Sequence, residues 1–159
     1  MSRVHRFRDG MWEDIEIRPY KPDPKDRFRN IARMVLAGDT SEEQIQFQVR
    51  YFVIEPGGYS SLERHQHEHV VIVLEGEGEV LLEDQVIPIQ PFDLIRIGPW
   101  TLHRFRNRSS TERFGFLCVV DRMRDRPQIP SAEEIEKLKR DPNLRDIVDP
   151  EDSPGSTGE

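Results

Sequence analysis

The sequence of 159 residues contains a single cysteine and no long apolar run. The one cysteine, Cys118, excludes a disulfide bond within the chain and is typical of proteins in a reducing compartment. The first residues lack the apolar core of a signal peptide, and no segment has the length and hydrophobicity of a membrane span. We therefore expect a cytoplasmic protein without a membrane partner.

Basic residues are also fewer than acidic ones. The chain has 23 lysine and arginine residues against 30 aspartate and glutamate residues, which gives a net charge of −7. Binding to nucleic acid requires a concentrated basic face, so we expect no nucleic-acid partner. Arg104, Arg106 and Arg108 alternate along the chain, and we interpret them as the solvated face of a strand.

Short apolar stretches separated by glycine, proline or aspartate fill the middle of the chain. The first runs from Gln44 to Ile54 and alternates polar with apolar residues, and we expect Pro56-Gly57-Gly58 to end it. Further strands are expected at residues 70–74, 79–82, 85–89, 94–97, 103–107 and 113–120. Short strands at such regular spacing predict an all-β sandwich or barrel. Cys118 lies in the last strand and is interpreted as a small core side chain.

Different patterns flank this central region of residues 44–121. Residues 1–43 contain a short strand near Ile15, a proline-rich loop at residues 20–26, and a segment at residues 30–36 that we expect to be a strand. In residues 122–145, Ser131-Ala-Glu-Glu134 forms a capping box before Ile135 and Leu138, which predicts a short amphipathic helix packed on the barrel. Residues 146–159 are expected to form a disordered tail.

Four of the five histidines fall at two places in the sequence. His65, His67 and His69 alternate in one segment that also contains Glu63, and His103 lies much further along the chain. Imidazole and carboxylate groups are common ligands of divalent transition metals, and alternate residues of a strand share one face. These residues therefore predict a metal site assembled from two segments.

The first of these segments resembles the first motif of the cupin superfamily. That motif runs Gly, five residues, His-x-His, three or four residues, Glu, six residues, Gly. With Gly57 as its first glycine, the ligand positions fall on Glu63, His65 and His69, and the last glycine falls on Gly76. Histidine and glutamate have exchanged places, because Glu63 stands at a histidine position and His69 at the glutamate position.

The second segment resembles the second cupin motif, which runs Pro-Gly, five residues, Pro-x-Gly, two residues, His, three residues, Asn. Pro91, His103 and Asn107 match it at the right intervals. The residues that depart from it are Phe92, Gly98 and Trp100. These departures affect turn positions and leave the ligand histidine in place.

The resemblance implies a metal site made of Glu63, His65, His69 and His103. An alternative frame pairs His65 with His67 and puts Val71 or Ile72 at the glutamate position, although neither can bind a metal. We therefore expect His67 to lie beside the site. The choice between Glu63 and His67 as the fourth ligand stays open.

The resemblance also implies an all-β cupin jelly-roll barrel, followed by the short C-terminal helix and the disordered tail. It implies one divalent transition metal, with Fe or Mn favoured and Ni, Zn, Cu and Co also compatible. The expected protein is a homodimer that acts on a small oxygen-chelating substrate as an Fe- or Mn-dependent dioxygenase. The alternatives are a non-redox isomerase or lyase acting on a sugar or keto acid, and a ligand-binding cupin without catalysis.

Other candidate residues receive structural interpretations. Trp100, Phe105 and Phe116 are expected in the barrel core rather than against the substrate. The remaining candidates, Arg50, Tyr51 and Arg96, are interpreted as structural or solvated.

Overall fold

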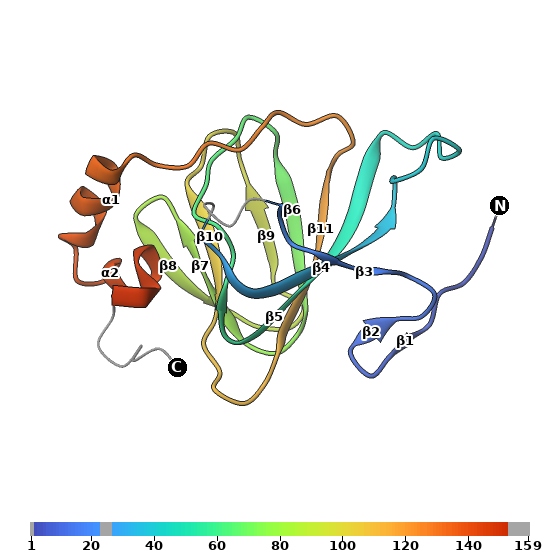
Figure 1. The fold of residues 1–159 in the computed structure, drawn as a ribbon, viewed down its shortest axis with the longest axis horizontal. Helices are drawn as coiled ribbons and strands as arrows, with labels where there is room; N and C mark the ends of the chain where they lie inside the picture. Colours follow the sequence, from blue (N-terminus) through green and yellow to red (C-terminus); the bar gives the residue numbers. More distant parts are fainter. Residues whose placement is uncertain (1, 23–26, 153–159) are drawn as a thin grey trace.

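The structure is a computed structural model that describes residues 2–22 and 27–152. Its described part is dominated by antiparallel strands that curl around a common core, with two short helices and a 3₁₀ turn near the C-terminal end (Figure 1). The prediction of an all-β barrel is confirmed. The predicted tail beyond residue 152 and part of the proline-rich loop lie outside the described residues.

Most strands belong to one nine-stranded sheet. Seven of them follow the order β8-β7-β10-β5-β11-β6-β9, and the other two are β4, which pairs with β5, and β3, which pairs with β4. The strands are β3 (Ile17–Pro19), β4 (Arg29–Ala37), β5 (Phe47–Tyr59), β6 (His69–Glu75), β7 (Gly78–Leu82), β8 (Gln85–Ile89), β9 (Leu94–Ile97), β10 (His103–Asn107) and β11 (Phe114–Asp121). A separate hairpin of β1 (Phe7–Arg8) and β2 (Met11–Trp12) lies near the N-terminus (Figure 1).

Strand β5 continues past the point where we expected it to end. Its first part pairs with β11, and Tyr59 at its end pairs with Arg106 of β10. Gly57 has φ +77°, a conformation that favours glycine, so the Pro56-Gly57-Gly58 segment bends the strand instead of stopping it. The bend carries the following residues towards β10 and its histidine.

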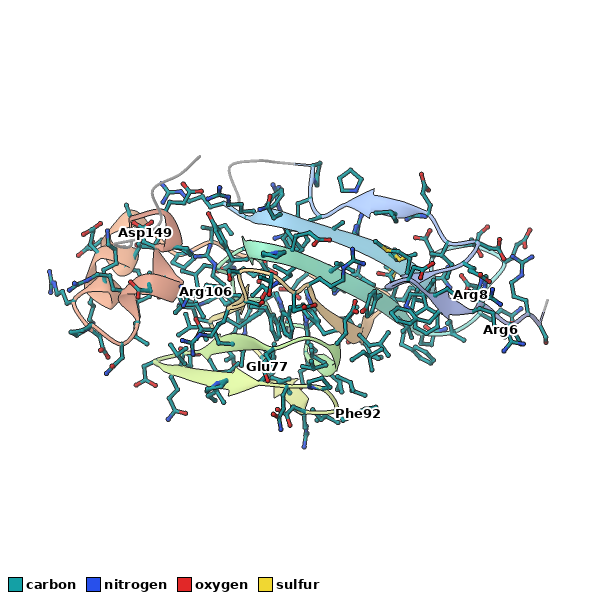
Figure 2. All side chains as sticks on the ribbon, turned by 90° about the horizontal axis from the view of Figure 1, so that it is seen from below. Arg6, Arg8, Glu77, Phe92, Arg106 and Asp149 are labelled. Carbon is teal, nitrogen blue, oxygen red and sulfur yellow. The ribbon has the colours of Figure 1, made fainter. Side chains whose placement is uncertain are left out.

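The core lies between the inner faces of the strands. Phe105 and Phe116 are buried there with ring centroids 4.5 Å apart, which confirms that they belong to the barrel core. The prediction for Trp100 was wrong, because its side chain is 43% exposed in the turn before β10. Phe92, in the loop before β9, is also exposed and projects away from the sheet (Figure 2).

The C-terminal extension packs on one end of the barrel. Helix α1 (Ala132–Lys139) has Ser131 as its N-cap, with the Ser131 hydroxyl accepting a hydrogen bond from the Glu134 amide, as the capping box predicted. Ile135 and Leu138 pack against a buried cluster formed by Leu62, Leu81, Leu102, Leu144, Ile147 and Val148. Helix formation and its packing on the barrel are therefore confirmed. No helix in residues 2–22 and 27–152 is long and apolar enough to cross a membrane.

The described residues that follow α1 are folded, although we assigned those from 146 onward to a disordered tail. Helix α2 (Arg145–Val148) and the 3₁₀ turn η2 (Pro150–Asp152) occupy residues assigned to the tail, and Ile147 and Val148 are buried. Burial of two apolar side chains orders this segment. The division of the chain at residues 43, 121 and 145 stays a prediction.

The alternating arginines do not form a solvated face. Arg104 is 2% exposed and donates hydrogen bonds to the carbonyl oxygens of Ile147 and Val148, at 3.0 and 2.9 Å. Arg106 lies beside the C-terminal helices (Figure 2), where it pairs with the buried Glu79. The prediction was wrong for both because the C-terminal segment covers this part of β10.

Candidate metal centre

The bend in β5 brings two distant segments of the chain together. Beyond Tyr59 the chain runs alongside the start of β10, where Glu63 and His103 exchange backbone hydrogen bonds of 3.1 and 3.0 Å. His69 is the first residue of β6, and His103 is the first residue of β10. Between Glu63 and His69, the loop that carries His65 is held by a 2.7 Å bond from the Trp100 amide to the His65 carbonyl.

Three histidines converge in this region. Each of His65, His69 and His103 offers a ring nitrogen, and these nitrogens lie within 4.8 Å of one another. All three side chains are buried, with exposed fractions of 1%, 9% and 3%. Such a cluster of buried imidazoles matches the ligand chemistry of a divalent transition metal.

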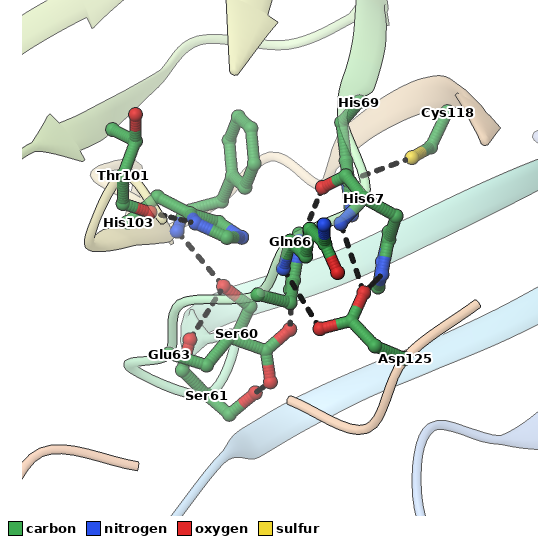
Figure 3. A network of polar contacts seen from close by, with 12 residues as sticks. Ser60, Ser61, Glu63, Gln66, His67, His69, Thr101, His103, Cys118 and Asp125 are labelled. Carbon is green, nitrogen blue, oxygen red and sulfur yellow. Dashed lines mark hydrogen bonds and ion pairs between the residues drawn. The ribbon is translucent and has the colours of Figure 1, made fainter. Parts of the chain in front are cut away.

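One nitrogen of each ring is fixed by a neighbour (Figure 3). The Nδ1 atom of His65 lies 2.7 Å from the carbonyl oxygen of His67, and that of His103 lies 2.8 Å from the carbonyl oxygen of Thr101. A carbonyl only accepts, so both rings carry their proton on Nδ1. The Nδ1 atom of His69 lies 3.2 Å from the Cys118 sulfur.

The opposite nitrogens are left for a ligand. The Nε2 atoms of His65 and His69 are buried and have no hydrogen-bond partner. A buried polar atom without a partner is costly, and metal-binding histidines commonly have the other ring nitrogen fixed in this way. The three histidines therefore fit a metal ion bound through Nε2.

The protonation states of the histidines agree with this role. Burial is the largest cause that lowers the pKa of His65, to about 4, with further lowering by the neighbouring histidines His103 and His67. Burial also lowers the pKa of His69 and of His103. Neutral imidazoles are the metal-binding form, so the site is ready to bind near neutral pH.

Glu63 lies beside the three histidines, with one carboxylate oxygen 3.9 Å from His65 Nε2. Its other oxygen forms an ion pair with Lys21 and accepts a 2.8 Å hydrogen bond from the Ser61 hydroxyl. Burial raises the pKa of Glu63, but the nearby Lys21 and His103 outweigh burial and lower it overall. Glu63 is therefore ionised and close to the histidines, and its role as a ligand stays a prediction.

His67 has different partners. Its ring stacks on His65 with centroids 3.7 Å apart, and its Nδ1 lies 2.7 Å from an oxygen of Asp125. Asp125 also accepts hydrogen bonds from the backbone amides of Gln66 and His67 (Figure 3). Asp125 thus fixes the loop that positions His65. Neither Asp125 nor Lys21 belongs to a motif, so the sequence offered no signal for either residue.

A small pocket opens next to the histidines. Its lining combines Glu63, His69 and His103 with hydroxyl, thiol and apolar side chains, namely Tyr20, Ile31, Phe52, Ser60, Ser61, Phe105, Phe116 and Cys118. The cavity volume is about 30 Å³, which is room for two or three water-sized groups, since one needs roughly 10–15 Å³. Cys118 is buried as we predicted, and it also lines this pocket.

Comparisons with known proteins agree with this fold. A family model described as a cupin domain matches residues 50–120. The chain is 36% identical over 138 residues to 1-methylthio-D-xylulose 5-phosphate methylsulfurylase from Rhodospirillum rubrum. The aligned region covers 87% of this chain and 86% of that protein.

Two solved structures are also similar. A cupin 2 conserved barrel domain protein from Rhodopseudomonas palustris shares 35% identity with a TM-score of 0.81, covering 91% of this chain and 98% of that chain. A sugar phosphate isomerase of the cupin superfamily from Silicibacter pomeroyi shares 29% identity with a TM-score of 0.58, covering 70% and 73%. The chain therefore belongs to the cupin superfamily.

Proposed function

We propose that the protein is a metal-dependent enzyme that removes a methylthio group from a phosphorylated ketose without using dioxygen. The observation that carries the proposal is the convergence of three buried imidazoles, two of which, His69 and His103, line a small, largely apolar pocket. The substrate class is supported by the 36% identical relative, whose name specifies a methylthio ketose phosphate. The sugar phosphate isomerase from Silicibacter pomeroyi is a second relative named for a phosphorylated sugar.

The metal would be held by His65, His69 and His103, with Glu63 as the fourth proposed ligand. A bound divalent metal supplies Lewis acidity that polarises a substrate carbonyl. Removal of a methylthio group from the carbon beside a carbonyl benefits from this polarisation. In the proposed step, the thiolate of a low-molecular-weight thiol attacks the methylthio sulfur and forms a mixed disulfide with it. The electron pair of the broken carbon–sulfur bond passes to the carbon, which then takes a proton from solvent.

The protein's own residues would orient the reacting groups and exclude water. Aromatic rings of Phe52, Phe105 and Phe116 line the pocket, and thioether sulfur makes favourable contacts with aromatic rings. Tyr20 and Ser61 form a 2.9 Å hydroxyl pair beside Glu63, and burial, as the largest cause, raises the pKa of Tyr20. Tyr20 therefore stays protonated and can serve as a hydrogen-bond donor.

This proposal departs from the dioxygenase expected from the sequence, because the thiol that is oxidised to a mixed disulfide supplies the two electrons and no dioxygen is used. Both reactions use a metal-bound, oxygen-rich substrate, so the ligand set alone does not separate them. Two relatives named for a reaction, a methylsulfurylase and an isomerase, favour a reaction that does not use dioxygen.

The test is turnover of 1-methylthio-D-xylulose 5-phosphate by metal-loaded protein with a low-molecular-weight thiol, followed by phosphorus NMR under air and under argon. We expect equal rates in both gases and loss of activity after chelation of the metal. His103→Ala should be inactive for the same reason. Consumption that requires dioxygen would instead support the dioxygenase. No consumption in either gas, with a full complement of metal, would exclude this substrate.

A further inference from the structure

Two arginines lie on the same inner face of the sheet as the ligand His69. In the pairing of β5 with β11, Arg50 lies opposite Cys118, which lines the pocket. In the pairing of β4 with β5, Arg33 lies opposite Phe52, a core residue of that face. Because paired residues and alternate residues share a face, Arg33 and Arg50 both face the interior.

A third arginine joins them from the end of β11. The pKa of Arg124 is lowered by burial, the largest cause, and next by the charge of Arg50. The pKa of Arg33 is lowered by the same two causes in the same order. Arg50 is therefore within electrostatic reach of both other guanidinium groups.

None of the three arginines has a carboxylate partner in the part of the chain that the structure describes. Arg33 bonds the Pro19 carbonyl at 3.2 Å, and Arg124 bonds the Asp121 carbonyl at 2.9 Å. By contrast, acidic partners are present for Arg18, Arg64, Arg106 and Arg113. The charge of Asp39 acts on Arg33 without forming an ion pair. Three clustered guanidinium groups without a paired carboxylate are unusual in a chain with 30 acidic and 23 basic residues, because like charges repel.

Two buried polar atoms on this face of the sheet have no hydrogen-bond partner. The Nε atom of Arg50 is buried without a hydrogen-bond partner. Gln48, two residues earlier on the same face, is 7% exposed, and its side-chain oxygen also has no partner. Buried donors and acceptors of this kind are normally satisfied, so a ligand that bonds to them would remove a cost.

The three-arginine cluster is also next to the metal centre. Arg50 lies 3.5 Å from the Cys118 sulfur, and that sulfur lies 3.2 Å from Nδ1 of His69. A single side chain thus separates the guanidinium group of Arg50 from a ligand histidine. The arginines and the histidines are therefore neighbouring groups of opposite ligand preference.

We propose that Arg33, Arg50 and Arg124 form an anion subsite that binds the phosphate group of the substrate. Guanidinium groups bind phosphate oxygens through paired, charge-assisted hydrogen bonds. The unpaired oxygen of Gln48 would accept a hydrogen bond from a sugar hydroxyl. The assignment of the anion to a ketose phosphate rests on the proposed function, whereas anion binding itself does not.

The test is calorimetric titration of inorganic phosphate into the protein, with and without bound metal. Arg33→Gln and Arg124→Gln should each weaken phosphate binding by about tenfold, and Arg33→Lys should recover part of the loss. Arg96→Gln is the matched control, because Arg96 is exposed and pairs with the outward-facing Val70. Thermal unfolding midpoints and metal content should be unchanged in all four variants.

Unchanged phosphate affinity in both glutamine variants would overturn the proposal. The proposal would also be overturned if phosphate bound only to metal-loaded protein, with the same affinity in the wild type and in the variants. The metal would then hold the anion. In a second titration, D-xylulose 5-phosphate should bind more tightly than D-xylulose, and Arg33→Gln should remove the difference. If phosphate binding required the arginines but the methylthio sugar was not turned over, the anion subsite would stand and only the proposed function would be rejected.

Discussion

At the scale of single residues, the metal centre depends on how each imidazole is fixed. His103 donates from Nδ1 to the Thr101 carbonyl, which leaves Nε2 for a metal. His103→Ala removes one of three histidine ligands, so metal content should fall below about one tenth of an atom per chain. Elemental analysis of protein prepared without a metal-binding tag measures this. His67→Ala is the control, and an equal loss in that variant would assign His67 to the ligand set.

Glu63 pairs with Lys21, and its proposed role as a metal ligand would compete with that ion pair. If Glu63 is a ligand, Glu63→Gln should weaken metal binding by roughly 10–100-fold, since it removes the negative charge and keeps the shape. Lys21→Met should then leave the affinity unchanged or increase it, because the carboxylate no longer has to share its charge with Lys21. Competition with a fluorescent metal indicator measures both affinities. Unchanged affinity in Glu63→Gln would make Glu63 a partner of Lys21 only.

The motif spacing predicted the three histidines because spacing reports which residues a sheet can bring together. It carried no information on Lys21, Asp125 or the three-arginine cluster. Lys21 and Asp125 reach the site from segments outside the motifs, and the arginines come together only when β4, β5 and β11 pair. Such contacts depend on tertiary packing, which no local pattern contains.

At the scale of elements, strand positions were predictable from alternation and turn residues, but strand ends were not. Proline and two glycines are the usual signals of a turn, yet here they bend β5 and leave it paired with β10. Whether such a segment ends a strand or bends it depends on the partner strand. That partner lies more than forty residues further along the chain.

Arg104 connects three elements and should determine the order of the C-terminal segment. It donates to carbonyl oxygens of Ser60, Ile147 and Val148. Arg104→Met keeps the apolar stem but leaves these buried acceptors without donors, so the free energy of unfolding should fall by about 3 kcal/mol. Hydrogen exchange should also accelerate at the amides of α2.

Chemical denaturation and amide exchange measured by mass spectrometry provide these readouts. Arg108→Met is the control, because the Arg108 side chain is 58% exposed. A loss of less than about 0.5 kcal/mol, with unchanged exchange in α2, would show that the helix packs without this arginine.

At the scale of the whole molecule, an acidic chain encloses two sites of different character. The proposal assigns a cation to the three buried histidines and an anion to Arg33, Arg50 and Arg124, with Arg50 next to the Cys118 sulfur. A metal-bound sugar with a terminal phosphate would satisfy both sites at once. The homodimer expected from the sequence stays a prediction, as does the cytoplasmic location.

The stability of the metal-free protein should fall on mild acidification. Histidine titrates near 6.5 in the unfolded chain, whereas the pKa of folded His65 is about 4 and that of His69 is also lowered. Between pH 4 and pH 6.5 the unfolded chain binds more protons than the folded chain. The contribution of these histidines to the free energy of unfolding is therefore fully present above pH 6.5 and is lost as the pH falls towards 4. The midpoint of thermal unfolding should drop by roughly 5 °C from pH 7 to pH 5 in the presence of a chelator. His69→Gln should show a smaller drop, because it removes one histidine that resists protonation. A midpoint that stays constant or rises on acidification would mean that the buried histidines are already protonated when folded.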